Sequence, residues 1–246
     1  MPTNSDGCRS LGEVYSDRWY EGCRDGSADS ARLYTSYLWQ FIQPRSVLDA
    51  GCGRGHWLNA WEERGVTLLF GLDGAWNRQE QMRHPSIRFT PLDLNRPFEL
   101  THKVDLAMSL EVAEHLQPES AETFVGCLTH TSDLVLFGAA CPHQGGPNHL
   151  NERPATYWAE LFRARGFLPF DILRPVFWAD ARIPFWYRQN TFLYARQDSA
   201  SVCELGLQGL KPLEHIGFMD CIHPLLYACK VEDVATLKGH CAAGST

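Results

Sequence analysis

The chain has 246 residues and a net charge of −7, and 44% of its residues are hydrophobic. This composition is typical of a globular protein with a full hydrophobic core, and its acidic balance argues against wrapping a nucleic-acid backbone. No apolar run approaches the roughly 18 residues of a membrane-crossing helix, and the N-terminus lacks the basic patch and apolar core of a signal peptide. The nine cysteines form no Cys-x-x-Cys pair, which indicates reduced thiols. We therefore expect a cytoplasmic protein without a membrane or nucleic-acid partner.

The N-terminal arm is polar as far as residue 29. It suits either a partly ordered lead-in or a lid that closes over a ligand. Apolar side chains then recur at helical spacing, which predicts a helix over 30–43, capped by Asp29 or Ser30 and ended by Pro44. Three aromatic residues are the sizeable anchors of the arm: Tyr15, Trp19 and Tyr20.

Strands and helices alternate at short spacing through the rest of the chain. Short apolar runs bounded by turn residues predict strands over 46–50, 66–70, 87–90, 104–109, 134–137, 167–173 and 189–195. Helical spacing predicts helices over 56–64, 76–83, 118–127 and 154–165, and two more near 224–230 and 231–238. This alternation favours right-handed βαβ units, and hence an α/β fold with a parallel sheet and helices on both faces.

A glycine-rich turn follows the first predicted strand, in the stretch Ser46-Val-Leu-Asp-Ala-Gly-Cys-Gly-Arg-Gly55. Three alternating glycines let the backbone turn tightly and approach a ligand, because no Cβ stands in the way. The next helix directs its first amides toward whatever lies over the turn. The pattern therefore predicts a nucleotide or nucleoside site.

The residues around this turn indicate a nucleoside without phosphates. A dinucleotide fingerprint needs a glycine at its sixth position, where this chain has His56. The sequence contains no Gly-Lys-Ser/Thr, which excludes an ATP phosphate loop on pattern. A carboxylate at Asp49, two positions before the first glycine, would repel a pyrophosphate and suits a ligand that carries an amino group.

Four segments in the right order resemble class I S-adenosylmethionine-dependent methyltransferases: 47–55, 71–73, 91–94 and 108–116. The resemblance implies a three-layer αβα Rossmann-like sandwich, with a seven-stranded, mostly parallel sheet and an antiparallel last strand. It extends loosely to about residue 196. We therefore expect an N-terminal arm and helix (1–43), a methyltransferase core (44–197) and a C-terminal extension (198–246) that matches nothing in the family.

The resemblance also implies which residues bind the cofactor, S-adenosylmethionine. The glycine turn would approach its methionine part and ribose, and Asp49 would reach its amino group. Asp73 would accept hydrogen bonds from the ribose hydroxyls, and Asp93 would meet the adenine amino group, with Leu94 on the ring. Either carboxylate could instead stabilise a turn. The full set of expected cofactor residues is Asp49, Gly51, Cys52, Gly53, Asp73, Asp93, Leu94 and Leu110.

Methyl transfer needs an acceptor in line with the S–CH₃ bond, and for an alcohol, phenol or ammonium also a base. His149 is the first candidate and His143 the second, because both lie on the long loop 139–153 beyond a strand end. A loop-stabilising hydrogen bond is the alternative role for His149. We expect the acceptor to be an oxygen or nitrogen of a small metabolite, sugar or natural-product intermediate. A macromolecular substrate, a non-methylating binding protein and a homodimer remain open.

A second group of chemistry-bearing residues follows the strand at 104–109. If a helix begins at Glu111, then Glu111, Glu114 and His115 share one face and could hold a divalent cation with His149. This pattern resembles the metal site of plant small-RNA methyltransferases and ubiquinone-pathway O-methyltransferases. Metal-free relatives look similar, so we assign the site without a metal. The aromatic loop 177–187 is expected to wall a pocket or to fill the core.

Overall fold

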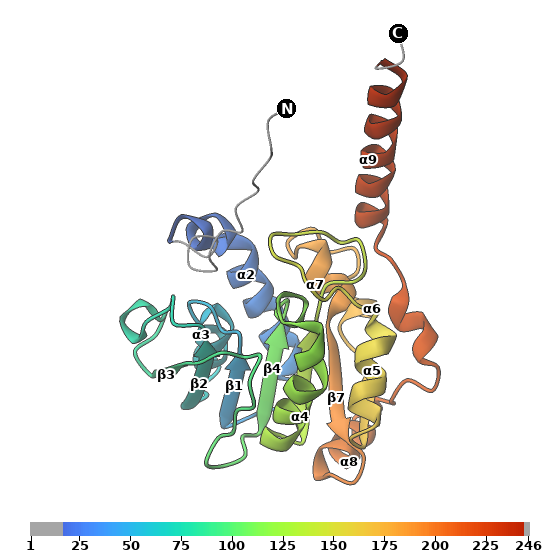
Figure 1. Cartoon of the computed structure of the whole chain (residues 1–246). Coiled ribbons are helices and arrows are strands. Elements are labelled where there is room, and N and C mark those ends of the chain that lie inside the picture. Colours follow the sequence, from blue (N-terminus) through green and yellow to red (C-terminus); the bar gives the residue numbers. More distant parts are fainter. Residues whose placement is uncertain (1–16, 244–246) are drawn as a thin grey trace.

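The computed structural model describes residues 17–243, and the side chains of residues 26–236 (Figure 1). A seven-stranded sheet with the order β3-β2-β1-β4-β5-β7-β6 forms its centre. Neighbouring strands from β3 to β5 are parallel, and β7 runs antiparallel to both β5 and β6. The strands are β1 (Ser46–Ala50), β2 (Leu68–Asp73), β3 (Ile87–Pro91), β4 (Leu106–Leu110), β5 (Leu134–Gly138), β6 (Phe167–Phe170) and β7 (Phe192–Arg196).

Helices cover both faces of the sheet, and alternate residues of each strand supply the two cores. Val47 of β1 packs in the core under α2 (Asp17–Leu38) and α3 (His56–Glu62), and Leu48 packs in the opposite core. That second core lies under α4 (Ala121–Thr131) and α5 (Ala155–Arg163). The expected three-layer sandwich with a mostly parallel sheet is therefore confirmed.

The predicted start of the first helix is wrong. Helix α2 begins at Asp17 and passes through residues 29 and 30 without a break. Ser30 is buried within it, and its hydroxyl donates to the carbonyl of Gly26 one turn earlier instead of capping a helix start. Trp19 and Tyr20 lie on this helix, although their side chains lie outside the described part, and Tyr15 lies outside the described residues.

Several boundaries differ from the predictions nearer the site. The second strand runs to Asp73 rather than ending at residue 70, and the expected helix over 76–83 is only a 3₁₀ turn at Gln79–Gln81. The aromatic segment is not one loop, because it contains parts of α6 (Arg174–Phe177) and α7 (Phe185–Asn190). The last strand therefore starts at Phe192 rather than 189.

The residues after β7 pack back onto the core. Helix α8 (Ala200–Leu207) was not predicted, and the two expected terminal helices are one continuous helix, α9 (Pro224–Ala243). The buried Arg174 guanidinium donates to the carbonyls of Phe218 and Met219, which fixes this segment beside α6. Helix α9 then projects away from the sheet (Figure 1). Among the described helices, none has the length and apolar character needed to span a membrane.

Candidate active site

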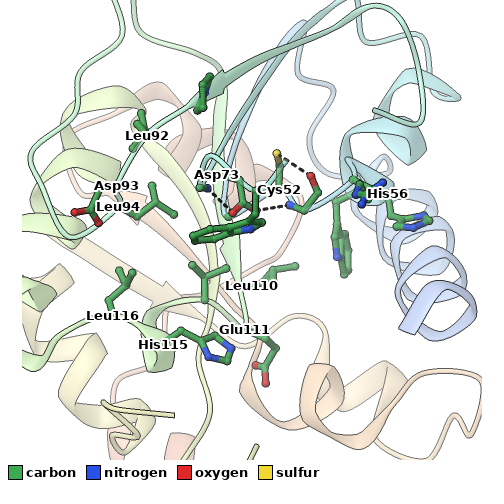
Figure 2. A pocket seen from close by; sticks show the side chains of 18 of the residues that line it. Cys52, His56, Asp73, Leu92, Asp93, Leu94, Leu110, Glu111, His115 and Leu116 are labelled. Carbon is green, nitrogen blue, oxygen red and sulfur yellow. Dashed lines mark hydrogen bonds between the residues drawn. The ribbon is translucent and has the colours of Figure 1, made fainter. Parts of the chain in front are cut away.

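A cavity of about 540 Å³ lies at the carboxyl ends of β1, β2 and β4. Strand β1 pairs with β2 on one side and with β4 on the other. The strand order therefore reverses at β1, and open α/β sheets bind ligands at such a point. In Figure 2, Asp73 lies near the middle of the cavity, with Asp93 and Leu92 toward one side and His56 toward the other. Glu111 and His115 lie next to each other along a third edge.

The glycine turn forms one wall and is pinned by β2. The amides of Gly51 and Cys52 both donate to the carbonyl of Leu72, at 2.7 and 3.1 Å. Gly51 has φ +91°, and a Cβ there would lie 2.2 Å from Val112 of the loop after β4. Glycine is therefore required at this position by a close approach of the protein to itself, in addition to any ligand.

Asp73 is a buried carboxylate at the end of β2, and protein donors already hold it. The amides of Gly53 and Gly74 donate to it at 2.7 and 2.6 Å. The Trp76 indole, which the sequence analysis did not single out, also donates to it. Burial raises the pKa of Asp73 to about 6 despite these hydrogen bonds, which favour its ionised form.

Asp49 does not line the cavity and lies behind its wall. It is only 2% exposed, and its Oδ2 has no hydrogen-bond partner among the described residues. Burial, and secondarily the charge of Asp73, raises the pKa of Asp49 to about 8. A buried carboxyl without a partner favours its neutral form, unless a cationic ligand comes near it.

The cavity end near β3 is formed by the segment Leu92–Asn95. Asp93 lines the cavity there, and its Oδ1 accepts hydrogen bonds from the amide and the side chain of Asn95 at 3.0 and 2.9 Å. These bonds lower the pKa of Asp93. Asp93 therefore stabilises a turn, as the alternative role proposed. It also lines the cavity beside Leu94. Of the expected cofactor residues, the structure brings seven to the wall: Gly51, Cys52, Gly53, Asp73, Asp93, Leu94 and Leu110.

Glu111 does not begin a helix, contrary to the sequence-based expectation. It has φ +56°, a left-handed conformation, and the 3₁₀ turn that follows begins only at Ala113. Its carboxylate lines the cavity and accepts hydrogen bonds from Gln144 and Asn190, each at 2.9 Å. Burial raises the pKa of Glu111 to about 7, although both bonds favour the ionised form.

Glu114, His115 and His149 form the metal-capable cluster among the described side chains, with one ligand atom of each within 4.8 Å of the others. Two imidazoles and a buried carboxyl are a donor set that suits a divalent transition metal. The carboxylate Oε1 of Glu152 lies 2.7 Å from His149 Nδ1, and a carboxylate in this position orients a ligand histidine. Glu111, whose carboxylate accepts hydrogen bonds from Gln144 and Asn190, is not a member of this cluster, so the predicted set changes by one member.

His115 lines the cavity, whereas His149 and His143 do not. The rings of His115 and His149 are in contact, with their centroids 4.8 Å apart. Burial, and secondarily His149, lowers the pKa of His115 to about 4. His143 is exposed, and its backbone amide donates a hydrogen bond to Glu152 at 2.7 Å.

Two elements distant in sequence meet at the cavity rim. The Ser27 hydroxyl of α2 lies 3.2 Å from the Tyr187 hydroxyl of α7, and both residues line the cavity. The ring of Trp57 on α3 packs edge-on against Tyr187, with centroids 5.3 Å apart. No sequence pattern predicts this pairing, beyond the general expectation that aromatic residues wall a pocket.

Comparison with known proteins agrees with this geometry. Residues 26–133 match a family model described as a methyltransferase domain. No curated protein sequence matches the chain.

Solved structures share the fold at low sequence identity. An amino pentose methyltransferase of Micromonospora echinaspora has a TM-score of 0.56 and 15% identity, over 79% of this chain and 100% of that one. Magnesium protoporphyrin IX methyltransferase of Synechocystis has a TM-score of 0.51 and 16% identity, over 78% and 90%. A putative O-methyltransferase of Nostoc punctiforme has a TM-score of 0.54 and 14% identity over 72% of this chain, which spans only 59% of that protein.

The fold is that of Rossmann-like methyltransferases, and the match to a methyltransferase-domain model indicates an enzyme that uses S-adenosylmethionine. The matched residues, 26–133, contain the glycine turn, the carboxylate at the end of β2 and the carboxylate that follows β3.

Proposed function

We propose that this enzyme methylates an oxygen or nitrogen of a small molecule, with His149 as the general base. The observation that carries the proposal is the contact between Ser27 and Tyr187, which joins α2 to α7 where both residues line the cavity. A cavity of about 540 Å³ is in the range that binds small molecules. Because the cofactor must share this volume, only a small acceptor group fits beside it.

The proposed cofactor position follows the order of the wall residues. The methionine part lies over Gly51 and Gly53, with its amino group toward Asp49, and the ribose hydroxyls take hydrogen bonds at Asp73. Adenine lies between Asp93 and the apolar side chains of Leu94 and Leu110. The ammonium group would offset the uncompensated Asp49 carboxyl, which supports this direction of binding.

The choice of His149 as base rests on its partner. The carboxylate of Glu152 lies 2.7 Å from His149 Nδ1, and a partner of this kind orients the imidazole of a general base. His115 is closer to the cavity, but its pKa of about 4 makes it a weak proton acceptor near neutral pH. In this proposal, water carries the proton to His149, which does not itself line the cavity.

A metal-assisted reaction is the second candidate for this site. Glu114, His115 and His149 would hold the cation, which would supply Lewis-acid activation of an acceptor hydroxyl. A macromolecular acceptor would need an open surface in place of the contact between Ser27 and Tyr187. A non-methylating role would leave the cofactor intact.

The cytoplasmic location and the homodimer remain predictions. A second copy could pack on the exposed apolar residues of α9, which are Leu225, Val231 and Val234.

The test measures release of S-adenosylhomocysteine over a panel of small amines and alcohols. We expect turnover by the wild type and at least a hundredfold loss of kcat in His149→Asn, with binding of S-adenosylhomocysteine unchanged by calorimetry. His143→Asn is the matched variant from the same loop, and a loss confined to it would transfer the role of base to His143. Turnover abolished by exhaustive chelation would favour the metal-assisted reaction instead.

A further inference from the structure

Glu111 is a carboxyl residue of the cavity wall that the proposed reaction does not use. Its left-handed backbone turns the chain just after β4 and leaves the side chain in the cavity wall between Leu110 and Val112. Figure 2 shows it beside His115, on the far side of Leu110 from Asp73. It is therefore separated from the carboxylate assigned to the ribose.

A chain of side-chain amides fixes the Glu111 carboxylate. Gln144 donates to its Oε2 and Asn190 donates to its Oε1, each at 2.9 Å. Asn190 also donates to Gln144 Oε1 at 2.9 Å, so the two amides hold each other. Gln189 donates to Asn190 Oδ1 at 2.9 Å and accepts from the amide of His223 at 2.6 Å. A fully connected network of this kind holds its end group in one orientation.

All of these donors are neutral. Among the described residues, no lysine or arginine forms an ion pair with Glu111. An ionised carboxylate has about four acceptor positions, and the amides occupy two of them. The protein thus fixes a carboxyl group in the cavity wall and gives it only neutral hydrogen-bond donors, which favours a ligand that brings a cation or N–H donors and so stabilises the ionised form.

We propose that Glu111 binds the acceptor group and selects an amine, as a specificity residue of the methyl transfer proposed above. The amine nitrogen attacks the methyl carbon, a C–N bond forms and the S–CH₃ bond breaks, with its electron pair left on sulfur. The positive charge moves from sulfur to nitrogen, and the ammonium proton then passes to His149 and to solvent. A fixed carboxylate beside that nitrogen stabilises the developing charge, and it disfavours an anionic acceptor.

The test uses two cofactor analogues and needs no identified acceptor. In sinefungin, a carbon that bears a primary amine replaces the sulfonium and its methyl group, so the amine lies where the methyl group faces the acceptor. S-adenosylhomocysteine lacks both the methyl group and the charge. Calorimetry gives the ratio of the two affinities for the wild type, Glu111→Gln and Glu111→Asp. Asp93→Asn is the matched control, since it removes a cavity carboxylate at the opposite end.

We expect Glu111→Gln to lower the sinefungin preference roughly tenfold or more while its affinity for S-adenosylhomocysteine stays near that of the wild type. Glu111→Asp keeps the charge and should keep part of the preference, which separates the charge from the amide network. Asp93→Asn should leave the ratio unchanged. An unchanged ratio in Glu111→Gln, or equal loss of both ligands in both Glu111 variants, would overturn the inference. Absence of S-adenosylhomocysteine binding to the wild type would instead overturn the proposed function.

Discussion

Two carboxyl groups close to the glycine turn have raised pKa values, and each has a different physical environment. Asp73 has three protein donors that partly offset its burial, and its pKa reaches about 6. Asp49 has an unpartnered oxygen and the charge of Asp73 nearby, and its pKa reaches about 8. The cofactor-free protein therefore carries Asp49 mainly in its neutral form at neutral pH.

The pKa of Asp49 has a consequence for stability. Because folding raises this pKa above the ordinary value of about 4, its contribution to stability is complete below pH 4 and is lost as the pH rises toward 8. Asp49→Asn removes the ionisation. We expect the free energy of unfolding of this variant, relative to wild type, to grow by roughly 1 kcal/mol per pH unit between pH 5 and 7. Urea unfolding without cofactor measures it, and a constant difference across that range would show that Asp49 is not buried as described.

At the scale of elements, the glycine turn and the loop after β4 are packed against each other. Gly51 and Gly65 have nearly the same backbone angle, with φ +91° and +95°. A Cβ at Gly51 would lie 2.2 Å from Val112, whereas a Cβ at Gly65 would meet nothing within 4 Å. The two positions therefore separate the cost of the angle from the cost of crowding.

Substitution of each glycine by alanine tests this packing. Gly65→Ala should cost only the positive-φ penalty of about 1–2 kcal/mol. Gly51→Ala should cost about 2 kcal/mol more, because Val112 must be displaced, and it should also weaken binding of S-adenosylhomocysteine. Urea unfolding and calorimetry measure the two effects. Equal destabilisation by the two variants would mean that the loop after β4 yields to the added methyl group at little cost.

The elements that depend on local pattern were predictable from sequence. The buried strands are short apolar runs between turn residues. Gly65 and Gly166 follow the ends of α3 and α5 with positive φ, as expected. The start of α2 was not predictable, because Ser30 has the same preference for a cap as for a bond to a carbonyl one turn back. The helix start expected at Glu111 was wrong for a related reason, because nothing in the local sequence indicates that this glutamate adopts a left-handed conformation.

At the scale of the whole molecule, the division between predicted and unpredicted residues follows sequence distance. The glycine turn, Asp73 and Asp93 come from consecutive βα units, so their order along the chain gives their neighbours around the cavity. The contact of Ser27 with Tyr187 joins residues 160 positions apart. The amide network joins Glu111 to Gln144, Asn190 and the segment after β7. Only tertiary packing brings these groups together, and no periodicity encodes it.

Binding of the methyl donor in this cavity, with Asp73 at its ribose, underlies the whole proposed reaction. Calorimetric titration of the full chain with S-adenosylhomocysteine tests this binding, with Asp73→Ala as the comparison and circular dichroism as a check that both proteins are folded. We predict saturable binding of one equivalent by the wild type and no detectable binding by Asp73→Ala. Absence of binding by the folded wild type, or the same affinity in the folded variant, would contradict the account.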